Sequence, residues 1–192
     1  MELTGNVSAP KILVVGCFHG DEPQGKYLIE EYLKEFPDTK LAMIPCLNEY
    51  GVQKNVRTNS NGVDLNRNFP TQNWELTERD NFFGGERPAS EDETQFIIDV
   101  IKQLKPKAIL TLHAPYKVVN YDGDALKLAE KISEIIGYPA EASIGYPTPG
   151  SFGTWAGIEN KIPTITLELD EEIDVKELRE PVFKVFKMLE EY

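Results

Sequence analysis

Residues 11–17 read KILVVGC, and two later runs share their character, KAILTL at residues 107–112 and PTITLEL at residues 163–169. All three are short, rich in β-branched residues and almost wholly apolar, which predicts strands covered on both faces. Residues 40–46 (KLAMIPC) predict a fourth strand. Helical apolar spacing separates these runs, so strands and helices alternate along the chain. The alternation predicts an α/β sandwich, with residues 11–17 in a central strand.

Four helices are predicted between and after these strands. The first begins at Pro23, whose missing N–H is not needed in a first turn, and ends before Pro37. The others are expected to begin at side-chain caps, namely Ser90 with Glu93, Asp124, and Asp174 with Glu177. Gly137 is expected to end the third helix, and Pro181 to kink or interrupt the last. The polar stretch 47–89 shows little periodicity, which predicts a long loop that is either functional or disordered.

Composition limits the domain organisation and the partners. A chain of 192 residues without a compositional break predicts one domain, residues 1–192. Its 20 basic and 32 acidic residues give a net charge of -12, so a nucleic-acid partner is not expected. Residues 1–10 lack the pattern of an export signal, and no apolar run is long enough to span a bilayer. We therefore expect a cytoplasmic protein with no membrane partner, in which Cys17 and Cys46 are buried thiols. The sequence does not define the oligomeric state.

The two histidines of the chain each follow an apolar run, His19 after residues 11–17 and His113 after residues 107–112. Sites in open α/β sheets form at the carboxyl ends of strands, where the loops diverge. Glu22 lies one short turn beyond His19, so the three side chains can meet at one point. Two imidazoles and one carboxylate with an open fourth position are a donor set of catalytic zinc sites. From spacing alone, ordinary polar residues at strand ends are an equally good interpretation.

A further motif, NGVDLNRNFP at residues 61–70, allows the sequence to be compared with one particular protein family. Together with HGDE at 19–22, the histidine at 113 and TLEL at 166–169, it resembles the zinc carboxypeptidase (carboxypeptidase A-like) family in order and residue type. The resemblance extends from about residue 12 to residue 170. It implies a three-layer α/β/α sandwich with a mixed, mostly parallel central sheet. It also implies a zinc metallocarboxypeptidase or amidase, a hydrolase with one Zn2+ ion.

The resemblance assigns the metal site. His19, Glu22 and His113 match the metal ligands of the family, and Asp64 matches the carboxylate that orients a ligand histidine. A plain polar turn around residues 61–62 would explain the start of the motif but not the DLNRNF that follows it.

It also assigns residues to the substrate. Asn66 and Arg67 match the pair that holds the terminal carboxylate, a task that suits the planar, two-donor fork of arginine. Arg57 matches the arginine that polarises the scissile carbonyl, although its position alone is also that of a solvated loop charge.

Glu168 matches the general base of the family, which takes a proton from the attacking water and passes it to the leaving amine. The alternative for Glu168 is an edge-strand glutamate that faces solvent. Tyr146 lies 168 − 146 = 22 residues before it, which is the separation of the mobile active-site tyrosine in the family, and Trp155 is also in register. A half-buried aromatic residue at the sheet edge is the structural alternative for Tyr146.

Residues 112–124 (LHAPYKVVNYDGD) and 145–169 (GYPTPGSFGTWAGIENKIPTITLEL) are most similar to the murein peptide amidase branch of the family. This implies hydrolysis of the γ-D-glutamyl-meso-diaminopimelate bond of a murein tripeptide with a free carboxylate, in peptidoglycan recycling. Gly153 departs from the pattern, because the usual specificity position carries neither a charge nor an apolar wall here. An amine on the substrate would then need another counter-charge, for which the candidates are Asp122, Asp124 and Glu159.

Two other functions remain open from the sequence. One is an N-acyl-amino-acid deacylase of the aspartoacylase or succinylglutamate desuccinylase type, whose relatives share similar HGxE and DLNR motifs. The other is a non-catalytic zinc- or peptide-binding module. Tyr146 and the complete DLNRNF favour the peptidase over the deacylase, and Glu168 with Arg57 argues against the binding module, since binding alone needs no general base.

Overall fold

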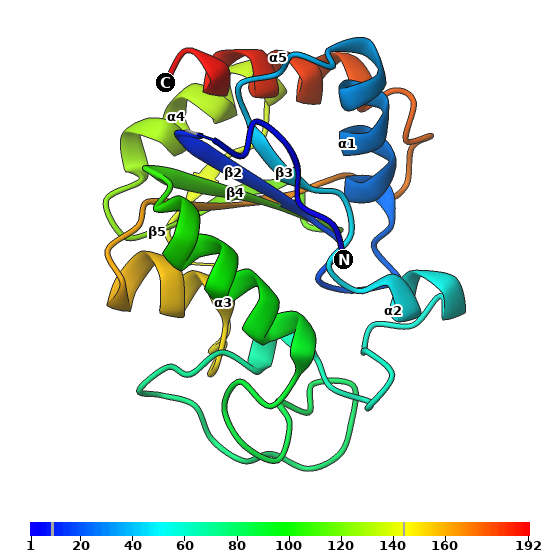
Figure 1. Ribbon diagram of the computed structural model, residues 1–192, viewed down its shortest axis with the longest axis vertical. Coiled ribbons are helices and arrows are strands. Elements are labelled where there is room, and N and C mark those ends of the chain that lie inside the picture. Colours follow the sequence, from blue (N-terminus) through cyan, green and yellow to red (C-terminus); the bar gives the residue numbers. More distant parts are fainter. Residues whose placement is uncertain (9, 144) are drawn as a thin grey trace.

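A mixed sheet forms the centre of the molecule. The computed structural model describes residues 1–8, 10–143 and 145–192 (Figure 1). In this part of the chain the strand order is β1-β3-β2-β4-β7-β5-β6. The strands are β1 (Thr4–Gly5), β2 (Ile12–Gly16), β3 (Ala42–Ile44), β4 (Ala108–His113), β5 (Val118–Asp122), β6 (Ala140–Glu141) and β7 (Thr164–Glu168). The pairs β3–β2, β2–β4, β4–β7 and β5–β6 are parallel. The pairs β1–β3 and β5–β7 are antiparallel.

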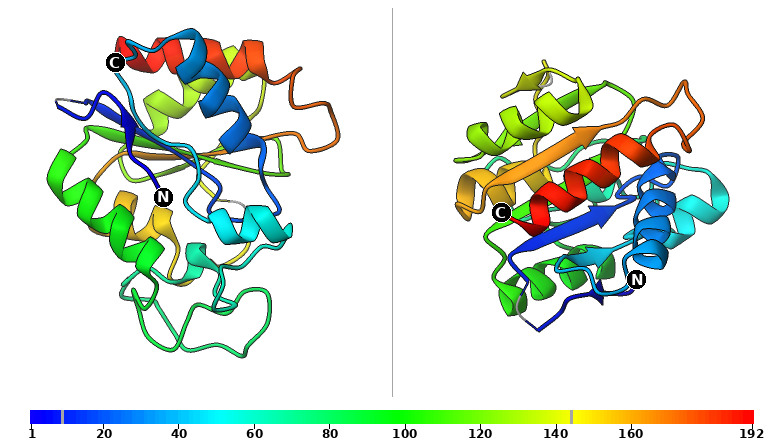
Figure 2. Two further views of the ribbon diagram at one scale, coloured as in Figure 1. Left: turned by 45° about the vertical axis from the view of Figure 1, so that its right-hand side comes forward. Right: turned by 90° about the horizontal axis from the view of Figure 1, so that it is seen from above.

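Helices cover both faces of this sheet. One face carries α1 (Gln24–Glu35), α4 (Leu126–Ile136) and α5 (Arg179–Glu190), and the other carries α3 (Asp92–Leu104) and the helical segment η2 (Thr154–Glu159) (Figures 1 and 2). Strand alternation divides the core accordingly: in β2, Ile12 and Val14 pack with the first layer, Leu13 and Val15 with the second. Each such buried aliphatic side chain contributes about 1.5–3 kcal/mol. The predicted three-layer α/β/α sandwich is confirmed.

The four predicted strands are present as β2, β3, β4 and β7, and β2 is internal as expected. The prediction lacked β5, whose sequence VVNYD is short and half polar, and the two-residue strands β1 and β6. The predicted loop 47–89 contains two short helical segments, α2 (Glu49–Lys54) and η1 (Leu65–Arg67).

The helix ends correct several expectations. Helix α1 begins after Pro23 and ends before Pro37, and Gly137 ends α4 in a left-handed conformation, as predicted. The three capping predictions are wrong: α3, α4 and α5 begin after Glu91, Ala125 and Leu178, none of which makes a side-chain cap. Helix α5 starts at Arg179, so Pro181 falls in its first turn, where a missing donor breaks no helical hydrogen bond.

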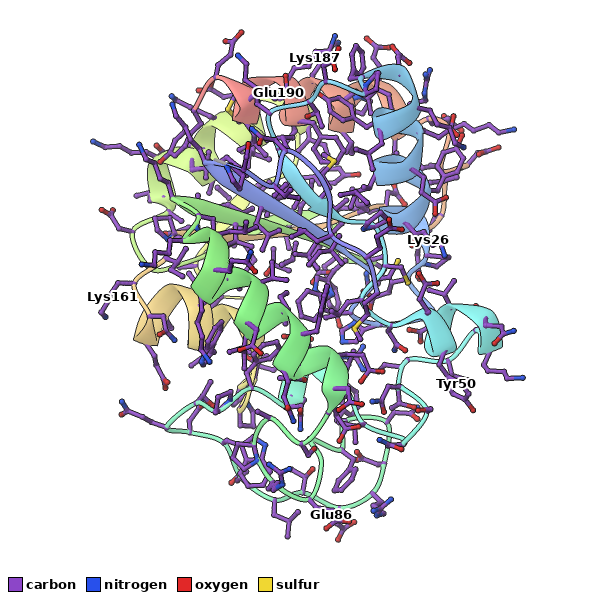
Figure 3. All side chains as sticks on the ribbon, viewed as in Figure 1. Lys26, Tyr50, Glu86, Lys161, Lys187 and Glu190 are labelled. Carbon is purple, nitrogen blue, oxygen red and sulfur yellow. The ribbon has the colours of Figure 1, made fainter. Side chains whose placement is uncertain are left out.

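The long loop lies at one end of the molecule. In Figure 3, Glu86 of this loop is at the end opposite Lys187 and Glu190 of α5. None of the helices among the described residues has both the length and the apolar character needed to cross a bilayer.

Candidate active site

Three neighbouring parallel strands bring the candidate residues to one edge of the sheet. Strands β2, β4 and β7 are adjacent and parallel, so their carboxyl ends coincide. His113 is the last residue of β4 and is the register partner of Glu168, the last residue of β7. His19 follows β2 after Cys17, whose φ of 54° turns the chain over the sheet edge. Parallel pairing therefore assembles residues that are far apart in sequence.

His19, Glu22 and His113 form one compact group. The Glu22 carboxylate lies between the two rings, with Oε1 2.8 Å from His19 Nδ1 and Oε2 3.0 Å from His113 Nδ1. The backbone N–H of Ala114 donates to the same Oε2 at 3.3 Å. The ring of Phe18 stacks on His113 with centroids 5.3 Å apart, which fixes the plane of that imidazole. One ligand atom from each member of the group lies within 4.8 Å of the others.

Asp64 supports this group from the η1 loop. It is fully buried, and its Oδ1 lies 3.0 Å from His19 Nε2 and accepts the N–H of Asn66 at 2.8 Å. Arg57 donates to Oδ2 through Nε at 2.9 Å and Nη2 at 2.8 Å. The remaining Nη1 of Arg57 is 3.6 Å from Glu22 Oε1. A carboxylate behind a histidine fixes its tautomer and makes it a better ligand.

The electrostatics of the metal-free group favour a cation. Burial alone would lower the pKa of His19, but the carboxylates of Glu22 and Asp64 raise it to about 9. Burial would raise the pKa values of Glu22 and Asp64, yet the His19 charge and its hydrogen bonds hold both well below their usual range. Burial lowers the pKa of His113. Without a metal, a proton on His19 supplies the positive charge that the carboxylates of Glu22 and Asp64 favour at this position.

Glu168 differs from the other acids because it lacks a positive partner. It is 6% exposed, and among the described residues its Oε2 has no hydrogen-bond partner. Burial, and then the negative charge of Glu22, raise the pKa of Glu168 to about 8. β7 lies inside the sheet, so the alternative of a solvent-facing edge glutamate is wrong.

A cavity of about 550 Å³ opens over this group. It is lined by His19, Asp21, Glu22, Arg57, Asn66, Arg67, Phe82, His113, Ala114, Pro115, Tyr116, Tyr146, Thr148, Glu168 and Glu171. The residues predicted as metal ligands, catalytic residues and substrate contacts therefore all line one space, whereas Asp64, which contacts His19 and Arg57, is not among the lining residues. Asn66 Oδ1 accepts the N–H of Phe152 at 2.8 Å, which leaves the amide nitrogen as the group that can donate to a ligand.

Two aromatic residues among those that line the cavity were not expected from the sequence. Phe82, in the long loop, lies over the guanidinium groups of Arg57 and Arg67, with its centroid 5.0 and 6.0 Å from their Cζ atoms. Tyr116 lies against Tyr146, with ring centroids 6.5 Å apart. The sequence signal for Phe82 was only an aromatic residue in a polar loop, whereas Tyr116 follows His113 closely enough to have been considered.

The donor set fits a zinc ion. Two imidazole nitrogens and one carboxylate oxygen converge, a carboxylate supports His19, and Glu168, one oxygen of which has no partner among the described residues, lines the same cavity. An α/β sheet with this group at the carboxyl ends of its strands defines the class: an α/β protein with a metal site of the mononuclear zinc-hydrolase type.

Comparison with known proteins identifies the family. A family model described as zinc carboxypeptidase matches residues 2–134. Murein peptide amidase A of Escherichia coli (strain K12) is 33% identical over 157 residues, which are 74% of this chain. The protein of the same name from Vibrio campbellii is 33% identical over 177 residues, which are 82% of this chain and 68% of the relative. The chain belongs to the zinc carboxypeptidase family.

A solved structure supports the same relationship. The crystal structure of murein-tripeptide amidase from Escherichia coli O157 superposes with a TM-score of 0.84 and 30% sequence identity, covering 97% of this chain and 83% of that one. The match to the Escherichia coli K12 relative spans only 64% of that relative's length.

Proposed function

We propose that this chain is a zinc-dependent hydrolase that cleaves the amide bond before the C-terminal residue of a small peptide. One observation carries the proposal: the buried carboxylate of Glu168, with an unpartnered oxygen, faces the same cavity as the His19–Glu22–His113 group and the Asn66–Arg67 pair. A structural or purely binding site has no need for an unpaired buried acid, which is costly to keep.

We assign His19, Glu22 and His113 as ligands of one Zn2+ ion, with Asp64 orienting His19. Bound in such a site, zinc acts as a Lewis acid and lowers the pKa of a coordinated water. Arg67 and the amide nitrogen of Asn66 hold the carboxylate of the substrate, and Arg57 directs Nη1 to the carbonyl oxygen. Removing one preorganised donor to the reacting carbonyl oxygen, the role assigned here to Arg57, typically lowers the rate by about 10²–10³-fold.

Glu168 moves the proton. Its pKa of about 8 places it near neutral pH, where a group can both accept a proton from the attacking water and return it to the leaving amine. Tyr146, 43% exposed at the cavity mouth, can donate a hydrogen bond to the substrate next to the scissile bond.

The proposed substrate is a murein tripeptide, cleaved between γ-D-glutamate and meso-diaminopimelate. The identities to proteins named murein peptide amidase A support this choice. We further infer one catalytic domain over residues 1–192, acting in the cytoplasm in peptidoglycan recycling; the free thiols of the buried Cys17 and Cys46 are consistent with a reducing compartment.

The test compares zinc-loaded and chelator-treated protein on three substrates: L-Ala-γ-D-Glu-meso-diaminopimelate, the same peptide amidated at the carboxylate that Arg67 holds, and an N-acyl amino acid. The expected result is zinc-dependent release of diaminopimelate from the free peptide alone. Preferential cleavage of the N-acyl amino acid would establish the deacylase instead, and no cleavage by zinc-loaded protein would establish a binding module.

A further inference from the structure

A second cavity, of about 220 Å³, adjoins the first and carries its own carboxylate. The two cavities share Asn66, Tyr146, Thr148 and Glu168. Asp122, the last residue of β5, lines only the second. This second cavity therefore begins where the proposed scissile bond and terminal carboxylate lie, and it extends away from the metal ligands.

The register of β5 and β7 explains how the cavity is lined. Asn120 pairs with Thr166, and Asp122 lies further along β5 than Val118, the partner of Glu168. Because side chains alternate between faces, Glu168, Thr166, Asn120 and Asp122 all project from one face of the sheet into the cavity. Asp122 is four residues from the level of Glu168, about 13 Å along the strand, so it lies at the far end of this cavity wall from Glu168.

The carboxylate of Asp122 has no visible structural task. Among the described residues it makes no hydrogen bond or ion pair, and burial raises its pKa to about 6. Keeping an acid in such a place costs stability unless a ligand of opposite charge binds to it.

The protein backbone is shaped around this side chain. A Cβ on Gly153 would lie 2.1 Å from Asp122 Oδ2, and one on Gly157 would lie 2.4 Å from Asp122 Cβ. At Gly157 the contacts include backbone atoms of Asp122, so η2 can approach β5 this closely only with glycine there, whereas a side chain at Gly153 would take the space of the Asp122 carboxylate. Gly153 is also the position expected to set specificity. The space that a side chain at Gly153 would occupy holds the carboxylate of Asp122, which belongs to β5.

The other two candidates for a counter-charge lie elsewhere. Asp124 is exposed, and neither it nor Glu159 is among the residues that line the cavity. Glu159 Oε1 accepts the N–H of Gln72 at 2.7 Å, which is a structural contact.

We propose that Asp122 is the specificity residue of this protein, whose carboxylate binds the side-chain ammonium of the C-terminal residue of the substrate. The chemical class is a peptide whose last residue bears an amine at the end of a long side chain, as in diaminopimelate or lysine. This inference rests on the proposed function, since it assumes that Asn66 and Arg67 hold the terminal carboxylate of that residue.

The test uses the full zinc-loaded chain and two peptides that differ only in their last residue, L-lysine or the uncharged L-norleucine. The ratio of the two kcat/KM values measures the preference for the ammonium. In Asp122→Asn the ratio is expected to fall by on the order of 10- to 100-fold, the typical value of a charged hydrogen bond. Asp124→Asn, two residues away and exposed, is the matched control and should keep the wild-type ratio.

An unchanged ratio in Asp122→Asn would overturn the proposal, as would a wild-type protein that prefers norleucine. Binding of free meso-diaminopimelate, lysine and norleucine by calorimetry gives a readout without turnover. If wild-type protein cleaves neither peptide, the proposed hydrolysis fails, but a lysine affinity that exceeds that of norleucine and disappears in Asp122→Asn still supports the ammonium site. Equal affinities for lysine and norleucine would contradict it.

Discussion

His113 and Glu168 are register partners at the ends of the adjacent parallel strands β4 and β7. One belongs to the candidate metal group, and the other is the acid with an unpartnered oxygen. Because both are the last residues of their strands, the sheet itself sets the separation between the candidate ligand His113 and the proposed base Glu168. Metal binding by His113 and proton transfer by Glu168 belong to two different side chains, so each role can be tested by its own substitution.

Glu168→Gln should lower kcat on the murein tripeptide by on the order of 10²–10⁴, the usual contribution of a general acid–base group. Zinc content should stay at the wild-type level, because Glu168 is outside the His19–Glu22–His113 group. Elemental analysis and steady-state kinetics measure both. Glu171→Gln, at an exposed acid that lines the same cavity, is the control. Full turnover in Glu168→Gln would show that another group moves the proton.

Zinc should stabilise the folded chain. An ion that binds only the folded state adds ~2.7 kcal/mol when its free concentration is about 100 times Kd, so Tm should rise with added zinc and fall with a chelator. His113→Ala should abolish this response, because it removes one of three ligands. Asp21→Asn, which changes a cavity acid outside the group, should retain it. A zinc-dependent Tm in His113→Ala would require a different ligand set.

Asp64→Asn should weaken zinc binding by about 10- to 100-fold, as is typical when the partner of a ligand histidine is lost. The buried carboxylate contacts both His19 and Arg57, so kcat should fall as well. A competition titration with a chromogenic chelator measures the zinc affinity. The control is Asp99→Asn on α3, far along the chain and exposed. Wild-type affinity in Asp64→Asn would mean that His19 is oriented without it.

Arg67→Lys should lower kcat/KM by on the order of 10- to 100-fold, mainly through KM, because an ammonium cannot make the two parallel hydrogen bonds of a guanidinium to a carboxylate. Steady-state kinetics on the free and amidated peptides measure the effect, which should vanish for the amidated one. Arg87→Lys, at an exposed arginine, serves as control. An equal loss on both peptides would mean that Arg67 does not hold the carboxylate.

The stability contribution of Asp122 should depend on pH. Burial raises its pKa from 3.8 to about 6, so the folded state holds the proton more tightly than the unfolded state does. Ionised Asp122 therefore destabilises the protein above pH 6, and the penalty disappears as pH falls below about 4. Asp122→Asn should raise Tm at pH 8 and leave it nearly unchanged at pH 4, measured by thermal unfolding against Asp124→Asn. A lower Tm at pH 8 would reveal a structural partner for the carboxylate.

The sequence alone predicted the layers, four of the strands and eight of the residues that line the cavity. Those predictions succeeded because buried strands need continuous apolar runs, and because parallel strands must place their carboxyl ends at one edge. The capping predictions failed because tertiary packing, more than a local side-chain hydrogen bond, sets the residue at which α3, α4 and α5 begin.

What the sequence determined by itself is the chemistry available: two histidines after strands, an acid inside an apolar strand, and an arginine-containing motif that resembles one family. The tertiary structure decided which of three acids faces the cavity beside Glu168. In the sequence, Asp122, Asp124 and Glu159 are equally good candidates for the counter-charge. Only the antiparallel register of β5 on β7, and the close approach of Gly153 and Gly157, direct Asp122 into that cavity. The reason is physical: strand register and backbone approach arise from contacts between segments far apart in the chain, which local sequence does not encode.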